Sequence, residues 1–583
     1  MRRLTSILGS VLLGTFLLAG AACTAPDAGT IAFPAGWRYG ADAAPATGTR
    51  GMVVTTDELA SRVGVEVLSA GGNAVDAAVA VQFALAVVNP EAGNIGGGGF
   101  MVLRTGAGAT AALDFREKAP LAATRDMYLD EQGNLTSESV VGHLASGVPG
   151  SVAGMWAAHE RYGVRDWAAL VEPAIRLAEG FEVRERFLGS LGTDMIESLA
   201  AFPASAAQFL PRDGRPPAVG DTLRQPDLAE TLRRIRDHGP DGFYRGRTAD
   251  LIVAEMERGG GIISHEDLES YEAAWRDPIT FTYRDHTIVS MPPSSSGGAT
   301  MAEMANILMR YDLASLPWHG SDMVHLYAEA WKRAYADRNH YLADPDFVEM
   351  PLERMTSPEY GAERAETISL ESATPSMEIG PGLAGSAEGE NTTHFSIVDG
   401  EGTAVAVTTT INSWYGSKVT VTGAGFVLNN EMDDFAAKPG TPNQFGLVQG
   451  ENNAVGPGKR MLSAMTPTIV LDPSGSLRMI TGTPGGSTII TTVFQTISNV
   501  LDYGMNAVEA VNAPRVHHQH LPDQIYYEEG GLDAETVAAL EELGHTLIER
   551  SDVSGDVQMI LVGADGVLSG WSDPRRGGVA IAY

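Results

Sequence analysis

The stretch Asn391-Thr-Thr-His-Phe-Ser-Ile-Val-Asp399, followed by Ala404-Val-Ala-Val-Thr-Thr-Thr-Ile-Asn412, decides the fold of this chain. From Thr393 to Ile397 large apolar and polar residues alternate, the period of two that is typical of a strand. Asp399-Gly-Glu-Gly402 supplies a turn, and residues 403–411 form a second run rich in β-branched residues. The sequence therefore predicts a hairpin that begins with a pair of threonines.

A segment of different character leads directly into this hairpin. Residues 371–391 are rich in Gly, Pro, Ser and Glu, and they have too few large apolar residues to offset the entropy of ordering. They are predicted to be a linker or an exposed loop. A threonine hydroxyl needs a base to become a nucleophile, and a terminal threonine carries one, an α-amino group of pKa roughly 7.7–8.0. Attack of Thr392 on the Asn391 carbonyl would create that terminus. Without further context, such a pair is more often structural.

The two runs resemble the gamma-glutamyltransferase family, in which the first threonine of Thr-Thr-His is both the autocleavage site and the nucleophile. That position is Thr392 here. Motifs along nearly the whole mature chain carry the same resemblance: Gly72–Ala80, Asn94–Phe100, Asp114–Glu117, Pro292–Gly298, Lys332–Arg338, Leu428–Phe435, Thr483–Ser487 and Ala513–His518. The resemblance implies an α/β (α+β) fold of the N-terminal nucleophile hydrolase type, a four-layer αββα sandwich. It also implies a heterodimer cut from one precursor, with residues 49–391 as large subunit, residues 392–583 as small catalytic subunit, and no cofactor.

A gamma-glutamyl group carries an α-carboxylate and an α-ammonium far from the bond that breaks. The guanidinium of Arg116 matches a carboxylate bidentately, and the resemblance gives it that role, although a surface salt bridge is the ordinary alternative. Glu431 and Asp434 suit the ammonium, and the apolar residues around them predict partial burial. Asn412 resembles a family residue that accepts a hydrogen bond from the same group.

The resemblance also assigns residues around the reacting carbonyl. Ser463 should hydrogen-bond the α-carboxylate, but many members have a second serine where this chain has Ala464. A lost hydrogen bond to a charged group costs roughly 1.5–3 kcal/mol, which puts tight binding of a gamma-glutamyl group in question. Gly485 and Gly486 would present backbone N–H groups to the oxyanion. Thr410 would hydrogen-bond the nucleophile's hydroxyl and orient it.

Two further features of the small-subunit sequence are a lid-like segment and a group of histidines. Residues 438–450 resemble a lid over the pocket, with Phe445 where some relatives have a gating tyrosine. His517, His518 and His520 raise the alternative of a metal site, but no cysteine accompanies them and their spacing matches no standard zinc pattern. The family's similar His-His pair needs no metal, so we predict none.

The N-terminus is predicted to be an export signal. Residues 1–22 combine two arginines with an apolar stretch that ends in small residues. Cys23, the only cysteine, follows directly and resembles the lipidated residue of a bacterial lipoprotein, although an ordinary signal cut near Ala22 is the alternative. Residues 23–48 are then a flexible tether. We therefore expect a periplasmic protein that is tethered to a membrane through Cys23.

The rest of the chain reads as a mixture of helices and strands. Leu170 to Glu179 is predicted to be helical with Pro173 in its opening turn, and so is Asp322 to Arg338. Ala74 to Val88 is too short to span a bilayer and is predicted to be a buried helix capped by Asn73. Ala111 to Phe115 and Ile279 to Tyr283 are predicted strands.

Taken together, these features favour an exported enzyme that transfers a gamma-glutamyl group, from glutathione or related amides, through Thr392 to water, amino acids or peptides. A net charge of −33 argues against a nucleic-acid partner, because a phosphate backbone requires a basic face. Two alternatives remain. One is a glutaryl or β-lactam side-chain acylase of the same fold, kept open by Ala464. The other is an uncut, inactive, surface-tethered binding protein.

Overall fold

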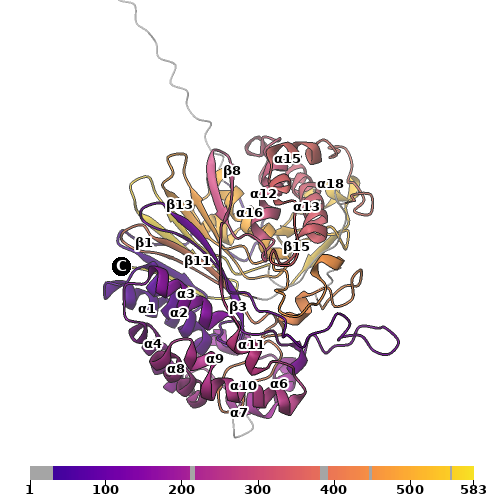
Figure 1. Ribbon diagram of the computed structural model, residues 1–583. Helices are drawn as coiled ribbons and strands as arrows, with labels where there is room; N and C mark the ends of the chain where they lie inside the picture. The colour runs from indigo at the N-terminus through magenta and orange to yellow at the C-terminus, as the bar shows by residue number, and fades with distance from the viewer. Residues whose placement is uncertain (1–30, 211–216, 381–391, 445–448, 552–553) are drawn as a thin grey trace, which may run out of the picture. The chain divides into compact units, whose positions relative to one another are not determined.

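Two seven-stranded sheets lie face to face in this computed structural model, which describes residues 31–210, 217–380, 392–444, 449–551 and 554–583 (Figure 1). Strands β10 and β11 of one sheet contact β17 and β13 of the other. The hairpin sheet has the order β19 (Val579–Ala582), β2 (Met52–Thr55), β10 (Thr393–Val398), β11 (Ala404–Thr410), β3 (Gly98–Arg104), β4 (Thr110–Asp114), β7 (Ala274–Arg276). The second sheet has the order β1 (Ala46–Gly48), β18 (Leu568–Ser572), β17 (Gln558–Val562), β13 (Leu477–Thr481), β12 (Thr468–Leu471), β9 (His286–Ser290), β8 (Ile279–Tyr283).

The predicted hairpin is the centre of the first sheet. β10 pairs with β11 in antiparallel register from Thr393 opposite Thr409 to Val398 opposite Ala404. β2 and β3 flank the pair, so both strands are interior, and every residue of both is buried. An interior strand loses no backbone hydrogen bond to solvent, which gives the start of β10 a rigid position.

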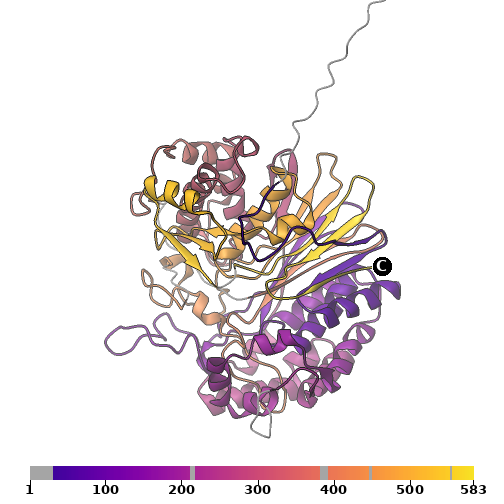
Figure 2. The same ribbon diagram turned by 180° about the vertical axis from the view of Figure 1, so that it is seen from behind.

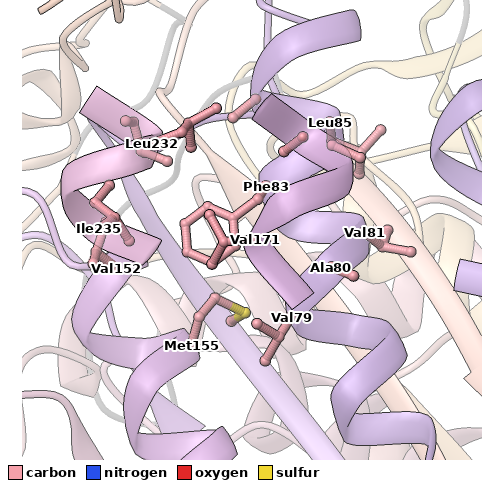
Figure 3. Packing of buried hydrophobic residues seen from close by; sticks show 14 of the residues in the cluster. Val79, Ala80, Val81, Phe83, Leu85, Val152, Met155, Val171, Leu232 and Ile235 are labelled. Carbon is pink, nitrogen blue, oxygen red and sulfur yellow. The ribbon is translucent and has the colours of Figure 1, made fainter. Parts of the chain in front are cut away.

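Helices cover the outer face of the hairpin sheet. α2 (Ala74–Val88) begins where Asn73 forms a capping box with Asp76, and all its residues are buried between the sheet and other helices (Figure 3). This confirms the predicted buried helix and its cap. The layer also contains α1 (Glu58–Ser69), α3 (Ser151–Tyr162), α4 (Trp167–Glu179), α8 (Pro226–His238), α9 (Asp241–Tyr244), α10 (Gly246–Gly259) and α11 (His265–Glu269), with α5 (Glu185–Gly189), α6 (Thr193–Ala200) and α7 (Pro203–Phe209) along the chain between α4 and α8.

A second group of helices accompanies the other sheet, which completes the predicted four-layer αββα arrangement (Figure 2). It consists of α12 (Gly297–Leu308), α13 (Ser321–Tyr341), α14 (Leu352–Met355), α15 (Pro358–Ala365), α16 (Thr488–Leu501), α17 (Ala507–Asn512) and α18 (Ala534–Glu542). A small sheet of β14 (Val516–His517), β15 (Ile525–Glu528) and β16 (Leu547–Arg550) lies at its side, and β5 (Phe181–Glu182) pairs with β6 (Thr222–Leu223) elsewhere. The helices and strands predicted around 170–179, 322–338, 111–115 and 279–283 are confirmed as α4, α13, β4 and β8.

Two local predictions are corrected. Pro173 does not lie in the opening turn of its helix, because α4 begins at Trp167 and places the proline in the second turn. The Trp167 ring is buried against Phe83 and its indole donates to the Ile235 carbonyl, so tertiary packing extends the helix beyond its apolar pattern. The Ala169 carbonyl consequently lacks its helical donor.

The second correction concerns the predicted flexible tether, part of which is packed against the folded protein. From Phe33 onward the chain lies on the body of the protein: the Trp37 indole donates to the Asn512 carbonyl, and β1 pairs with β18. Trp37 and Tyr39 also stack on the guanidinium of Arg575. Three aromatic rings within seven residues supply contact area that the small-residue composition concealed. The predicted signal and Cys23 lie outside the described residues, and within them no helix is long and apolar enough to cross a membrane.

Candidate active site

One cavity brings together most of the residues predicted from the sequence. It leaves about 10 Å³, room for a single water molecule, because side chains fill most of it. Its lining consists of Arg116, Thr392, Thr410, Asn412, Glu431, Asp434, Ser463, Ala464, Met465, Gly486 and Ile489. Residues separated by more than three hundred positions in the sequence thus meet at one end of the central hairpin.

Thr392 directly precedes β10 and is 4% exposed. Since Thr393 pairs with Thr409, continuing the register sets Thr392 opposite Thr410. The Thr410 hydroxyl accepts from the backbone N–H of Asn412 at 2.7 Å. The expected hydrogen bond between the two threonine hydroxyls stays a prediction, supported by this register and by their shared cavity.

His394 supports the strand rather than the chemistry. Its ring is fully buried and lies between the hydroxyls of Thr408, at 2.8 Å, and Ser396, at 3.1 Å. Burial lowers the pKa of His394 to about 3, so the ring is neutral at physiological pH. Only a glycine fits at position 482, because a Cβ there would come within 2.3 Å of the ring.

Gly485 and Gly486 lie just before α16. Both have positive φ angles, 137° and 57°, in a region that side chains disfavour. Gly486 lines the cavity, whereas Gly485 is not among its lining residues. The first N–H groups of a helix have no intrahelical acceptor and carry partial positive charge, so this turn suits a developing oxyanion. The assignment of both glycines to the oxyanion hole stays a prediction.

Arg116 follows β4 and is buried to 1% exposure. Its guanidinium pairs with Glu431, at 2.5 Å, and with Asp434. Burial by itself would lower the pKa of Arg116, but the surrounding carboxylates raise it above its ordinary value. The alternative of a surface salt bridge is wrong, because all three side chains are buried. The acidic pair is buried more completely than the predicted partial burial.

Glu117 is a site residue to which the sequence reasoning gave no role. It is fully buried, 3.5 Å from the Arg116 guanidinium, and neither of its carboxyl oxygens has a hydrogen-bond partner among the described residues. Burial raises the pKa of Glu117 to about 8 and that of Glu431 well above its ordinary value, while Arg116 opposes both shifts. The motif Asp114-Phe-Arg-Glu117 contained the signal, because Glu117 directly follows the arginine that was predicted to bind the substrate carboxylate.

A Glu117→Gln substitution should change how stability depends on pH. The unfolded carboxyl ionises near pH 4.3, whereas the folded one keeps its proton to about pH 8. Between these values unfolding releases a proton, so the wild type loses stability as pH rises and the glutamine variant does not share this loss. We therefore compare the difference in melting temperature, Glu117→Gln minus wild type, at two pH values. We expect this difference to be more positive at pH 8 than at pH 5. Thermal unfolding with exposed Glu160→Gln as control checks this; equal differences at both pH values would contradict it.

Ser463 is held by a motif from the other half of the chain. Its backbone N–H donates to the Ser294 carbonyl at 3.0 Å, and its carbonyl accepts from the N–H and the hydroxyl of Ser296, both at 2.7 Å. Arg338 in turn donates to the Ser296 hydroxyl at 2.7 Å. The predicted middle motifs Pro292–Gly298 and Lys332–Arg338 therefore position the loop that carries Ser463.

The flanks of the predicted lid lie against the acidic residues. Gln444 and Asn443 contact Asp433, and the Gln449 side chain donates to the Asp434 carbonyl at 3.0 Å. Phe445 lies outside the described residues, so its gating role stays a prediction. Asn412, which also lines the cavity, adopts a left-handed φ of 70° and donates to the Asn430 carbonyl.

The three histidines considered for a metal have other partners. His517 contacts Thr491 and Gln519, His518 contacts Asp523, and His520 donates to two backbone carbonyls. Within the described residues a different group, His325, Glu329 and His545, brings possible ligand atoms within 4.8 Å of one another. The Glu329 carboxylate, however, already pairs with Lys332 and Arg333. That no metal is bound stays a prediction.

A larger hollow of about 990 Å³ lies elsewhere, among the turns that follow the other ends of the strands. It is lined by Arg104, Arg478 and the turn residues around Asp399 and Asp472, and none of the predicted site residues borders it. Size therefore does not identify the reactive site; the convergence of a nucleophile candidate, a guanidinium and three carboxyls does.

The chain is similar to known proteins over most of its length. A sequence profile of the gamma-glutamyltranspeptidase family matches residues 60–583. The chain is 48% identical to the glutathione hydrolase proenzyme of Escherichia coli K12 over 91% of both chains. The gamma-glutamyltranspeptidase structure from Helicobacter pylori is 45% identical with a TM-score of 0.55, over 56% of this chain and 93% of that one. The cephalosporin acylase structure from Bacillus halodurans has a TM-score of 0.80 at 28% identity, over 94% and 99%.

Proposed function

The chain belongs to the gamma-glutamyltranspeptidase family, and on this premise we propose that it is a gamma-glutamyltransferase and hydrolase that cleaves gamma-glutamyl amides such as glutathione. The observation that carries the proposal is the buried arrangement of Arg116 between Glu431 and Asp434 in the cavity of Thr392. An amino-acid head group has one carboxylate and one ammonium. Such a head group can insert between these side chains. Its carboxylate would then pair with Arg116, and its ammonium would pair with Glu431 and Asp434.

Self-cleavage would prepare the nucleophile. The Thr392 hydroxyl attacks the Asn391 carbonyl carbon, an ester forms as the Asn391–Thr392 amide bond breaks, and the released nitrogen takes the hydroxyl proton. This step already frees the α-amino group of Thr392. Water then hydrolyses the ester, which restores the Thr392 hydroxyl and leaves a carboxylate on Asn391. Residues up to 391 become the large subunit and residues 392–583 the small one. The proenzyme relatives support processing of this kind.

Turnover repeats the chemistry on a substrate. The α-amino group of Thr392 takes the hydroxyl proton as the oxygen attacks the γ-carbonyl, and it passes that proton to the leaving amine. N–H groups at Gly485 and Gly486, before α16, would bind the negative oxygen of the tetrahedral intermediate. The gamma-glutamyl ester on Thr392 then reacts with water or with the amine of an amino acid or peptide.

The acylase alternative differs in one charge. A glutaryl group has the carboxylate for Arg116 but no ammonium for Glu431 and Asp434, which would remain paired only with the arginine. The acylase structure matches the fold over the whole chain, but at 28% identity against 48% for the glutathione hydrolase proenzyme. Ala464 lines the cavity and is buried, so the missing serine hydroxyl still bears on affinity.

A comparison of two anilides tests the proposal. We expect kcat/KM for a gamma-glutamyl anilide to exceed that for the glutaryl anilide by about 10- to 150-fold, since a buried charge-assisted contact contributes about 1.5–3 kcal/mol. Asp434→Asn should reduce the first value and leave the second nearly unchanged. Faster turnover of the glutaryl anilide, or equal losses for both substrates in the variant, would favour the acylase.

Export and anchoring complete the proposal. The N-terminal signal, with lipidation at Cys23, would place the protein in the periplasm and tether it to a membrane. Only the sequence features of residues 1–23 support this part.

A further inference from the structure

The histidine-rich turn between β14 and β15 contacts the segment that leads toward Thr392. Residues 373–380, the described end of the predicted linker, form neither helix nor strand, yet Ser376 and Ile379 are buried. The Asp523 carboxylate accepts from both the N–H and the hydroxyl of Ser376, at 2.8 and 2.7 Å. The His520 ring donates to the carbonyls of Ser376 and Ile379, at 2.8 and 2.9 Å.

Surrounding groups hold these two side chains in place. His518 donates to Asp523 at 3.2 Å and accepts from the His520 backbone N–H at 3.0 Å. Burial would raise the pKa of Asp523, but its hydrogen bonds and nearby Lys332 hold it well below the ordinary value, so the carboxylate is ionised. His520 has a φ of 72°, a left-handed conformation that few residues other than glycine adopt. The backbone N–H of His520 is bonded to His518, and its ring is bonded to the linker. A strained conformation held by hydrogen bonds in this way is typical of a residue that positions others.

The other side of the segment is fixed by α13. Glu329 accepts from the Thr374 N–H at 3.0 Å, and Lys332 donates to the Thr374 carbonyl at 2.8 Å. The Ala373 N–H donates to the Leu543 carbonyl at 2.7 Å. The bond from Ala373 to Leu543, like the contacts of His520 and Asp523, joins two chain segments that cleavage would separate.

We propose that these contacts form a clasp, defined as Ser376 and Ile379 with His520 and Asp523, which positions the linker for self-cleavage before Thr392. This inference rests on the proposed self-cleavage. With the clasp closed, about twelve residues join Ile379 to Thr392. Without it, the nearest fixed point is Thr374, which α13 holds, and about seventeen residues join it to Thr392. The entropic cost of bringing Thr392 to the Asn391 carbonyl grows with this length, so attack geometry becomes roughly 1.7-fold less frequent.

The clasp also explains three features of the sequence that the catalytic proposal left unused. His520 donates to the linker backbone, His518 donates to Asp523, and Asp523 in turn accepts from Ser376. After cleavage the same contacts would keep the end of the large subunit docked on the small one. His520 and Asp523 are thus positioning residues: neither is among the residues that line the cavity of Thr392.

The test is a time course of fragment appearance after cell-free synthesis of the full chain, followed on denaturing gels. We expect Asp523→Asn and His520→Leu to slow processing about twofold, whereas His520→Gln, which keeps a donor, should process near the wild-type rate. Tyr327→Phe is the matched control, because it removes a buried hydrogen bond to Ser498 that also joins the two future subunits. Fully processed variants should retain wild-type kcat/KM.

Two results would overturn the clasp while leaving the proposed function intact. One is processing of Asp523→Asn and His520→Leu at the wild-type rate. The other is a slowing that only matches the fall in melting temperature and is shared by Tyr327→Phe. A wild-type chain that stays uncut would instead remove the proposed self-cleavage, and the clasp with it.

Discussion

Thr392→Ala should leave the chain as one uncut polypeptide with no measurable turnover of gamma-glutamyl amides. The substitution removes the hydroxyl that would attack both the Asn391 carbonyl and the substrate, and it also prevents release of the α-amino group that would act as base. Loss of a nucleophile that works as a unit with its base lowers kcat by about 10⁴-fold or more. Denaturing gels, N-terminal sequencing of the fragments and an anilide assay measure both effects.

Thr393→Ser is the matched control for this experiment. Thr393 begins β10 and is buried, with its hydroxyl 3.2 Å from that of Thr56, so the serine keeps the contact. It should yield a small fragment beginning Thr-Ser-His-Phe and retain activity. Cleavage that persists in Thr392→Ala, or a fragment beginning at residue 393, would assign the nucleophile elsewhere. An uncut and inactive wild type would favour the binding-protein alternative.

Arg116→Lys should lower kcat/KM for gamma-glutamyl anilides by about 100-fold. Lysine keeps the positive charge among Glu117, Glu431 and Asp434, so the folded protein is retained, but an ammonium cannot offer the planar pair of donors that matches a carboxylate. We expect most of the loss in KM, since binding of the α-carboxylate precedes the chemistry. Steady-state kinetics on the processed enzyme measure this.

Arg116→Met separates binding from stability. It removes the cation that pairs with these buried carboxyls, and breaking a buried pair in this way costs about 3–5 kcal/mol. The melting temperature should therefore fall well below that of Arg116→Lys. Arg62→Lys, in an exposed pair with Glu58, serves as control and should change stability by no more than about 0.5 kcal/mol. Wild-type kcat/KM in Arg116→Lys would exclude Arg116 as the carboxylate clamp.

The sequence predicted the local features of this protein well. The hairpin at Thr393, the helix over Ala74–Val88 and its Asn73 cap depend on side-chain periodicity and on contacts a few residues apart. Each of these patterns lies within a single helix or hairpin, so it can be recognised without knowing which other elements pack against it. The site residues came from a resemblance between motifs, and the structure gathers most of them in one cavity.

Pairings between distant segments were decided by the tertiary structure alone. Arg116 contacts Glu431 and Asp434, which lie more than three hundred residues away in the sequence. The same packing buries Glu117, and burial raises the pKa of its carboxyl. The extended start of α4 and the docking of Trp37 likewise depend on partners far along the chain. Sequence determines which side chains an element offers and on which face. Burial and the charges that share it arise only when the layers assemble, because desolvation and Coulomb interactions depend on distance in space.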